Sequence, residues 1–261
     1  MDKLFRRLSP RSRQGAVISV TALALCIGYW SLHSRSGEAR PSADEEASTL
    51  LERFRHVEVA SVSDAVEQLT GRRMYMTHRM RPVFPAKFAG VATTVLLKKD
   101  ETHPGSEGLR GMLEAIDRGS PGSVYVMVVE DGNDIAGMGG LMGTAMEARS
   151  FSGAVIDGGV RDVAYLQKIA FPVFALGIVP STSANHYRFA GSNIPVVCDG
   201  VEVQPNDIVA ADNDGVVVVP RAQAKSVVEL AEQMDFKEHS MYATIEKFKS
   251  ILKAVEQFGR I

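Results

Sequence analysis

The sequence predicts a single α/β domain, and three observations support this prediction. Short apolar runs alternate with amphipathic stretches from Leu50 onward. Turns rich in glycine and proline separate these segments. The chain has 261 residues, of which 45% are hydrophobic, so it can bury one sizeable core. This alternation is typical of a sheet that is covered by helices.

The first half of the domain is expected to contain one capped helix and two strands. The helix is predicted over Asp64–Leu69, with Ser61 and Ser63 before it as capping residues. Strands are predicted over Gly90–Leu97 and Ser123–Val129, because both segments are rich in β-branched residues. Each of these strands is expected to be buried in the sheet.

A glycine-rich turn, Gly137-Met138-Gly139-Gly140, comes next. It leads into a stretch with helical propensity from Leu141 to Arg149, and then into a strand from Ala154 to Ile156. The second half repeats the alternation. Its expected elements are a helix over Asp162–Ile169, strands over Val173–Leu176, Val196–Val203 and Gly215–Val219, and helices over Ala222–Met234 and Tyr242–Phe258.

Residues 1–47 are predicted to lie outside the domain, which is expected to occupy residues 48–261. Five basic residues precede an uncharged stretch from Gly15 to Leu32, in the order typical of a signal peptide or a signal anchor. This stretch of roughly 18 residues ends near Tyr29 and Trp30, so it is long enough to span a bilayer. The polar segment Ser34–Ala47 is interpreted as a linker. The basic residues are Lys3, Arg6, Arg7, Arg11 and Arg13.

The positive charge before the apolar stretch predicts a cytoplasmic N-terminus and export of the remainder. We therefore expect an exported domain, either anchored in the membrane or secreted. The alternative, in which the apolar stretch is a core helix, is disfavoured by the polar linker that follows it.

Charge and cysteine content restrict the classes of partner. The formal net charge is −2 and no basic stripe is present, so the sequence gives no electrostatic footprint for nucleic-acid binding. The two cysteines, Cys26 and Cys198, do not form a disulfide framework or a zinc motif. Cys198 is expected to be a small buried hydrophobe. Small molecules are therefore the expected partners.

The glycine-rich turn is a candidate site for an anion. Glycines allow the backbone to approach a ligand closely, and the N–H groups that open a helix are unpaired donors. Together with the helix dipole, these donors favour a carboxylate or a phosphate. The alternative interpretation is a tight packing connection between a strand and a helix.

Arg161 and Asp162 form the second candidate site. They follow Gly158-Gly159 at a point where a strand is expected to lead into a helix, and α/β folds place ligands at such strand ends. Arginine can grip a carboxylate in two places, and aspartate is a hard oxygen ligand for magnesium or manganese. In the alternative interpretation the two residues are a solvated pair, and Asp162 caps the following helix.

Three segments together resemble the signature of a known family, that of the 4-hydroxy-4-methyl-2-oxoglutarate aldolases and the regulator of ribonuclease activity A. These segments are Gly139–Met142, Gly153–Asp162 and Asp207–Pro220. The resemblance covers most of Ala60–Met234 and leaves out the N-terminal segment.

The resemblance implies a swivelling β/β/α-type domain of the RraA-like kind, commonly a homotrimer. It implies cleavage of a 4-hydroxy-2-oxoacid to pyruvate, often with decarboxylation of oxaloacetate, and a divalent cation such as Mg²⁺ or Mn²⁺. Carried over by position, Arg161 would contact the substrate oxygens and stabilise an enolate, and Asp162 would hold the cation. The substrate would also bind the backbone N–H groups of Gly139, Gly140, Leu141 and Met142.

The sequence departs from the family pattern at Gly140. The aldolases carry an acidic residue there, whose carboxylate would help to hold a metal-bound water. Asp134, Glu147 and Asp157 are possible replacements, and Asp157 is the nearest of them along the predicted fold. Asp157 has an alternative interpretation as a strand-end residue that bonds to the glycine turn. The regulator proteins differ instead at the position of Asp162.

Further polar residues are candidates for an acid, a base or an anion contact near the site. They are His78, the segment Asn185-His186-Tyr187-Arg188, Glu238 and His239. No spacing links them to the main motif, so a structural role is favoured for each of them. Two rival functions also remain: a non-catalytic binding or regulatory protein, and a quinone-precursor methyltransferase, for which no nucleotide-binding fingerprint is present.

Overall fold

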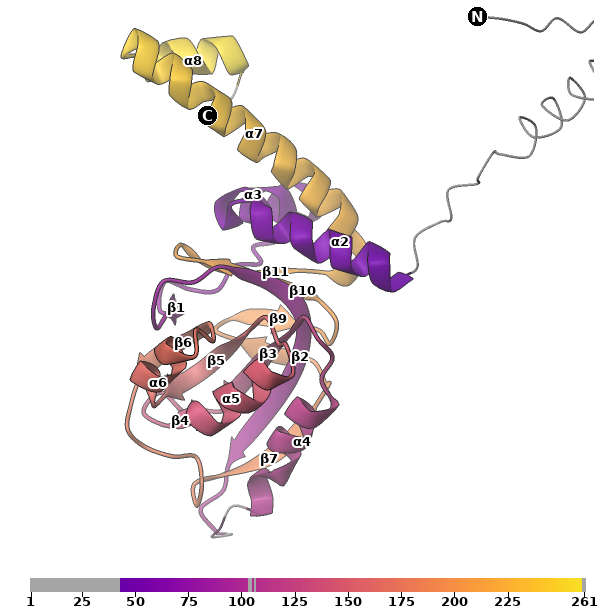
Figure 1. Cartoon of the computed structure of the whole chain (residues 1–261), viewed down its shortest axis with the longest axis vertical. Coiled ribbons are helices and arrows are strands. Elements are labelled where there is room, and N and C mark those ends of the chain that lie inside the picture. Colours follow the sequence, from indigo (N-terminus) through magenta and orange to yellow (C-terminus); the bar gives the residue numbers. More distant parts are fainter. Residues whose placement is uncertain (1–42, 103–104, 106, 260–261) are drawn as a thin grey trace, which may run out of the picture. The chain divides into compact units, whose positions relative to one another are not determined.

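The computed structural model describes residues 43–102, 105 and 107–259 of the chain (Figure 1). The predicted signal or anchor segment, Gly15–Leu32, lies outside these residues, and so does Cys26. Among the described helices, none combines the length and the apolar character that crossing a membrane requires.

A mixed sheet of nine strands forms the centre of the domain. Its four central strands, β2 (Phe88–Lys99), β3 (Ser123–Val129), β5 (Gly153–Val160) and β6 (Val173–Ile178), are parallel to one another. The path through the sheet is β1-β6-β5-β3-β2-β10-β11, with β4 paired to β5 and β7 paired to β2. The outer strands are β1 (Arg81–Pro82), β4 (Ala136–Met138), β7 (Tyr187–Ser192), β10 (Ile208–Asp212) and β11 (Gly215–Val219).

Two hydrophobic cores lie on opposite faces of this sheet. Tyr125 and Met127 of β3 point into one core, and Val124 and Val126 point into the other, because successive strand residues face opposite sides. The first core is covered by α4 (Arg110–Arg118), α5 (Gly140–Ala148) and α6 (Val163–Lys168), which Figure 1 shows together over the central strands. The second is covered by α2 (Ala43–His56), α3 (Val59–Thr70) and the start of α7 (Ala224–Phe248).

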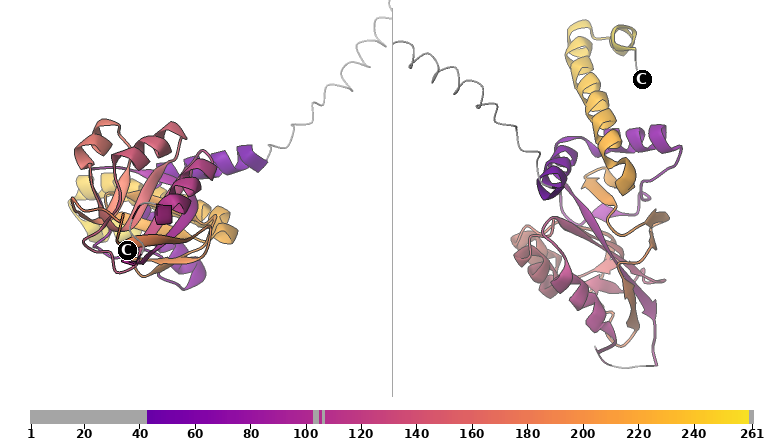
Figure 2. Two further views of the ribbon diagram at one scale, coloured as in Figure 1. Left: turned by 90° about the horizontal axis from the view of Figure 1, so that it is seen from below. Right: turned by 90° about the vertical axis from the view of Figure 1, so that its right-hand side faces the viewer.

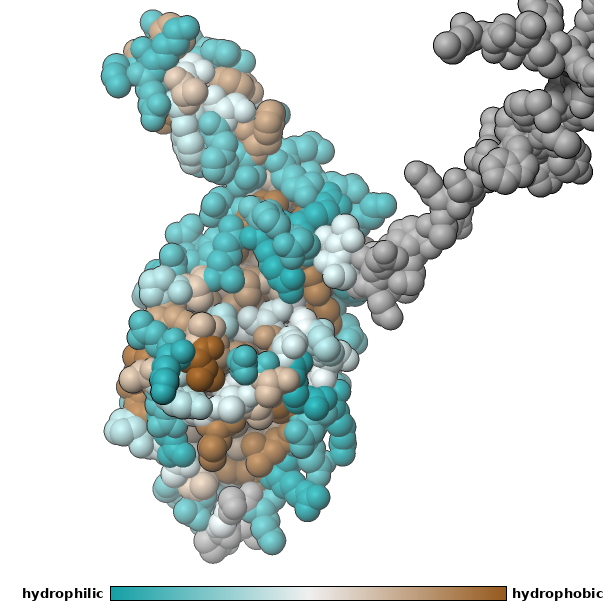
Figure 3. Space-filling model, in the orientation of Figure 1, coloured by the Kyte–Doolittle hydropathy of each residue, from teal (hydrophilic) through white to brown (hydrophobic). Residues whose placement is uncertain are grey.

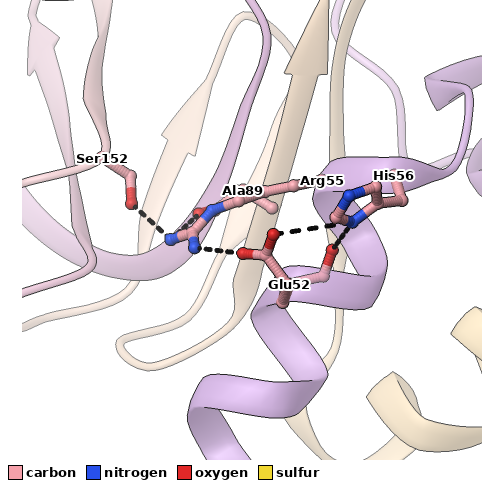
Figure 4. A network of polar contacts seen from close by, with 5 residues as sticks. All are labelled: Glu52, Arg55, His56, Ala89 and Ser152. Carbon is pink, nitrogen blue, oxygen red and sulfur yellow. Dashed lines mark hydrogen bonds and ion pairs between the residues drawn. The ribbon is translucent and has the colours of Figure 1, made fainter.

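Arg55 fixes α2 to the sheet (Figure 4). Its guanidinium group donates to the Glu52 carboxylate at 2.9 Å, to the Ala89 carbonyl at 3.3 Å and to the Ser152 hydroxyl at 3.2 Å. Ala89 lies in β2 and Ser152 immediately precedes β5. One side chain therefore joins the first described helix to the starts of two central strands.

The α/β prediction is confirmed, and several of its strands are found as expected. The strands at Ser123–Val129 and Gly215–Val219 have the predicted bounds. The segment Val196–Val203, which was expected to be one strand, is a hairpin of β8 (Val196–Cys198) and β9 (Val201–Val203). Asp199 and Gly200 both have positive φ angles, 42° and 84°, and form the turn that the prediction missed.

The C-terminal helices also break at a different place from the one expected. α7 continues through residues 235–241 to Phe248, and α8 (Ile251–Phe258) follows it. The break lies at Lys249, whose φ is 52°, and the hydroxyl of Ser250 accepts the N–H of Lys253 at 3.3 Å. The end of α7 and all of α8 extend away from the sheet (Figure 2).

The cap of α3 comes from a distant part of the chain. The helix begins at Val59, so Ser61 and Ser63 lie inside it and do not cap it as predicted. The Asp212 carboxylate accepts the N–H of Val59 at 3.0 Å and also that of Asp214 at 3.0 Å. Asp212 is buried at the end of β10. A strand-end aspartate therefore serves as the N-terminal acceptor of a helix that is far away in sequence.

Candidate functional site

The double glycine Gly158-Gly159 lies within a strand, not after one as predicted. β5 continues through both residues to Val160, and Gly159 is aligned with Ala136 of β4 and Gly177 of β6. A β-carbon on Gly159 would lie 2.9 Å from the Ile135 carbonyl oxygen. The glycine therefore allows β4 to pair closely with β5 and places the turn after β4 beside Arg161.

Asp162 connects this strand end to the opening of α5. It has a left-handed backbone, with φ 60° and ψ 32°, which aspartate tolerates better than most residues. Its Oδ2 atom accepts the N–H of Gly140 at 2.9 Å. Asp162 is the N-cap residue of α6 by position, but no hydrogen bond joins its side chain to that helix, so the alternative interpretation of Asp162 as a side-chain cap of the following helix is wrong. The carboxylate caps α5 instead.

Arg161 is held at the same edge by its backbone and its side chain. Its N–H donates to the Met138 carbonyl at 3.1 Å, and its Nη1 donates to the Ser181 carbonyl at 3.2 Å. Its Nε lies 3.8 Å from Oδ2 of Asp162. The guanidinium and the carboxylate are each about half exposed, so both remain accessible to a ligand.

The opening of α5 has two N–H groups available for a ligand. The N–H of Gly143 is bonded to the carbonyl of Gly139 at 3.0 Å, and that of Gly140 is taken by Asp162. Among the described residues, the N–H groups of Leu141 and Met142 have no acceptor, as expected for the first turn of a helix. These donors and the helix dipole favour a bound anion.

A cavity of about 480 Å³ brings the predicted site residues together. One wall is formed by residues 136–142 with Arg161 and Asp162, so all six predicted residues line it. On the face of the domain that carries α5 and α6, hydrophobic residues reach the surface (Figure 3). The other walls come from residues 182–184 and from the start of α4 and the short helix before it, through Glu107, Leu109, Arg110, Met112 and Leu113.

Comparison with known proteins assigns the family. The model of the RraA-like family, described as Aldolase/RraA, matches residues 59–218. This chain belongs to that family. A relative from Halalkalibacterium halodurans, provisionally named 4-hydroxy-4-methyl-2-oxoglutarate aldolase, is 28% identical over 188 residues, which are 69% of this chain and 80% of the relative.

Solved structures agree with the RraA-like assignment. An uncharacterized protein from Pseudomonas syringae pv. tomato matches with a TM-score of 0.73 at 27% identity, over 81% of this chain and 94% of that protein. A Streptomyces coelicolor protein, described as an unusual member of the RNase ES inhibitor RraA family, matches with a TM-score of 0.65 at 22% identity, over 79% and 98% of the two chains. The second likeness shows the shared fold alone.

The carboxylates that line this RraA-like site are few, so they fit a cation that takes most of its ligands from water and substrate. In the described part of the chain, no three histidine, cysteine, aspartate or glutamate side chains gather as a metal cluster. Asp162 supplies one accessible carboxylate, and Glu107 is the other acid that lines the cavity. Magnesium usually keeps several waters and binds proteins through one or two carboxylates. Asp162 would therefore hold such a cation.

Asp157 does not replace the acid that is missing at position 140. It lies on the opposite face of β5, and its Oδ2 accepts the N–H of Asp199 at 2.7 Å. The alternative interpretation, a bond to the glycine turn, is therefore also wrong. Burial raises the pKa of Asp157, and the nearby charge of Asp199 raises it further, against the opposing effects of the Asp199 N–H bond and Arg79.

The remaining candidate residues do not line the cavity, and all of them are exposed except Tyr187, which is buried and whose hydroxyl donates to the Glu130 carbonyl at 2.9 Å. This group includes His78, His186, Asp134 and Glu147. Glu238 and His239 lie on α7, where Glu238 accepts the hydroxyl of Tyr242 at 3.0 Å. Within the described chain, the cavity thus contains only the main motif among the residues predicted from sequence.

Sequence reasoning missed the residues that surround the motif. Thr144 lies four residues after Gly140 and Tyr165 lies three after Asp162, so helical spacing was an available signal for both. They line a second hollow of about 530 Å³ that shares Gly140, Leu141 and Asp162 with the first. Glu107 and Arg110 carried no comparable signal, because they come from a separate element.

Proposed function

We propose that this protein is a divalent-cation-dependent lyase that cleaves a 4-hydroxy-2-oxoacid to pyruvate by retro-aldol chemistry. One observation carries the proposal: the open N-terminus of α5, the Arg161 guanidinium and the Asp162 carboxylate line one cavity. Relatives named as aldolases support the same class of reaction. Decarboxylation of oxaloacetate belongs to the proposal, because it forms the same enolate.

The chain's own groups would bind and orient the substrate. The N–H groups of Leu141 and Met142 would donate to the substrate carboxylate at the positive end of the helix dipole. Arg161 would donate to the 2-oxo oxygen, where negative charge develops. Asp162 would hold the cation, which when bound supplies Lewis-acid polarisation of the substrate oxygens.

The proposed reaction breaks the bond between C3 and C4. The proton of the 4-hydroxyl group leaves to water in the cavity, and the C4 oxygen forms a carbonyl. The electron pair of the broken bond moves to C3 and gives the pyruvate enolate, whose oxygen Arg161 stabilises. Protonation at C3 then gives pyruvate. Because the charge on the oxygen is larger in the transition state than in the substrate, the Arg161 contact lowers the barrier.

The test measures pyruvate release by the full-length protein. The substrates are 4-hydroxy-4-methyl-2-oxoglutarate and oxaloacetate, each with and without Mg²⁺ or Mn²⁺. We expect cation-dependent turnover that Asp162→Asn abolishes and that Asp157→Asn, a control carboxylate outside the cavity, retains. Absence of turnover in the wild type, or full turnover in Asp162→Asn, would refute the proposal.

A non-catalytic binding protein is the second candidate, and Gly140 is the observation that favours it. The missing carboxylate lowers the negative charge available to hold a cation and orient water. In this case, pyruvate and oxaloacetate should raise the melting temperature without being consumed. Thermal-shift titration alongside the turnover assay separates the two candidates.

We also propose that the protein self-associates, as the expected homotrimer. Large hydrophobic side chains are exposed where α7 and α8 extend from the sheet, and patches of this kind mark interfaces. They include Phe236 at 74%, Ile251 at 64% and Leu252 at 69% exposure. Light scattering should give a trimer mass for the wild type and a smaller species for Ile251→Asp/Leu252→Asp. A monomeric wild type would reject this proposal.

We further propose that residues 1–47 direct export and leave the domain anchored or secreted. The charge order in the sequence is the support for this proposal. A phosphatase that folds only outside the cytoplasm, fused after Ala47, should be active. An inactive fusion that accumulates at the same level would contradict export.

A further inference from the structure

Gly140, where the aldolases have an acid, is enclosed by three neighbours. Its N–H donates to Asp162 Oδ2 at 2.9 Å, and its carbonyl accepts the hydroxyl of Thr144 at 2.8 Å. A β-carbon built on Gly140 would lie 3.0 Å from Cδ1 of Tyr165, closer than side chains normally approach. The Tyr165 ring therefore occupies the space into which a side chain at position 140 would extend.

The Tyr165 ring is held in that space from both ends. Its backbone N–H donates to the carbonyl of Asp162 at 2.9 Å, and its hydroxyl lies 3.3 Å from the hydroxyl of Thr144. The contacts thus form a closed circuit from Gly140 to Asp162, Tyr165, Thr144 and back to Gly140. The Asp162 side chain is half exposed to solvent, while its bond to the Gly140 N–H within this circuit constrains its orientation.

The backbone does not require glycine at position 140. Gly140 is not among the residues with a positive φ angle, and it is the first residue of α5. An aspartate at that position would be compatible with a helix and would be favoured by the helix dipole. The ring of Tyr165, and not backbone strain, is thus what opposes a side chain there.

We propose that Tyr165 is a positioning residue that takes the place of the missing side chain at position 140 and holds the Asp162 carboxylate in the orientation that binds a divalent cation. The inference rests on the proposed function. Residues 140 and 165 are then a coupled pair. Glycine at position 140 with tyrosine at position 165 leaves Asp162 as the one oriented carboxylate. An acidic residue at position 140 would require a smaller side chain at position 165. Neighbours of metal ligands set affinity by fixing ligand orientation.

The experiment measures Mn²⁺ binding to the full-length protein by calorimetry, without substrate. Removing the ring in Tyr165→Ala should weaken Mn²⁺ binding by about tenfold or more, as is usual for residues that orient a ligand. Tyr165→Phe keeps the ring that contacts Gly140 and should bind Mn²⁺ nearly as the wild type does. Equal affinity for the wild type and Tyr165→Ala overturns the proposal.

The exchange of the pair provides an independent test. Gly140→Asp alone should not tighten Mn²⁺ binding, because its β-carbon meets the Tyr165 ring. The double variant Gly140→Asp/Tyr165→Ala should bind Mn²⁺ more tightly than either single variant, since two carboxylates then face the cation. Additive effects in this cycle would mean that the two residues are not coupled, and would overturn the proposal.

Two controls separate positioning from a general loss of structure. Gln167→Ala, an exposed change on the same helix outside both hollows, should leave Mn²⁺ affinity unchanged. If Tyr165→Ala does not fold, Gly140→Ala tests the same contact from the other side and should weaken Mn²⁺ binding. Mn²⁺ binding that survives in Asp162→Asn refutes the proposed function. Loss in Asp162→Asn without loss in Tyr165→Ala refutes only the role of Tyr165.

Discussion

Oδ2 of Asp162 accepts the backbone N–H of Gly140 at 2.9 Å, so the end of one strand caps a helix that begins 22 residues earlier. The bond fixes one carboxylate oxygen and leaves the side chain half exposed. It also uses only the first of the donors at the opening of α5. The same contact therefore orients the candidate cation ligand and preserves the candidate anion site beside it.

Arg161→Lys is expected to lower kcat for pyruvate formation by about 10²–10³-fold, the usual effect of losing one donor to a developing oxyanion. Lysine carries the charge but cannot bond Ser181 and the substrate with one planar fork. Arg79→Lys is the control, because Arg79 bonds to Asn133 and does not line the cavity. Near-normal kcat in Arg161→Lys would argue against the assigned role.

Gly139→Ala is expected to disrupt the site and lower the free energy of unfolding by about 1–3 kcal/mol, as overpacking does. The new β-carbon would lie 2.6 Å from Asp162 Oδ2 and 2.9 Å from Arg161 Cγ. Gly177→Ala is the matched control, since a β-carbon there has no neighbour within 4 Å. Urea denaturation of both variants compares them. Equal free energies of unfolding for the two variants would contradict the prediction, because they would show that the neighbours of Gly139 accommodate a β-carbon without loss of stability.

Asp212→Ala is expected to lower the free energy of unfolding by about 1–2 kcal/mol, the usual cost of a lost helix cap. The change removes the acceptor for the N–H groups of Val59 and Asp214. Ser63→Ala should cause no loss, because Ser63 lies inside α3 and does not cap it. Chemical denaturation distinguishes the two positions, and the opposite ranking would favour the cap expected from sequence.

Asp157→Asn is expected to stabilise the fold at neutral pH. Burial raises the pKa of Asp157 above its ordinary value of 3.8, so the protonated form is favoured in the folded state. The protonated carboxyl of Asp157 therefore contributes fully to the stability of the folded protein at pH values below 3.8, and this contribution is lost as the pH rises through the raised pKa. Asparagine still offers an oxygen to the N–H of Asp199. The stability gain over the wild type should therefore grow with pH and then level off. A stability gain that becomes smaller as the pH rises would contradict the raised pKa of Asp157.

The sequence predicted elements whose identity depends on local pattern. Val216 to Val219 can hardly form anything except a strand, and β11 has the predicted bounds. The hairpin at Asp199 was missed, because an aspartate with positive φ has no unique local signature. The cap of α3 was missed for a different reason: its acceptor, Asp212, approaches only through the tertiary fold.

In the candidate site, too, the features set by local sequence were predicted and those set by the tertiary fold were not. The motif from Gly139 to Asp162 correctly indicated which residues line one cavity, because the two turns belong to adjacent strands β4 and β5. It did not indicate that Asp162 turns away from its own helix. That orientation depends on the left-handed backbone at Asp162 and on the nearby N–H of Gly140.

The cap of α3 has a consequence for the order in which the protein can fold. Val59 and its acceptor Asp212 are 153 residues apart. During synthesis the N–H of Val59 cannot reach this acceptor until the segment that forms β10 has been made. Contacts of such long sequence separation form slowly and late. The cap of α3 is thus completed by one of the last two strands of the described chain to leave the ribosome.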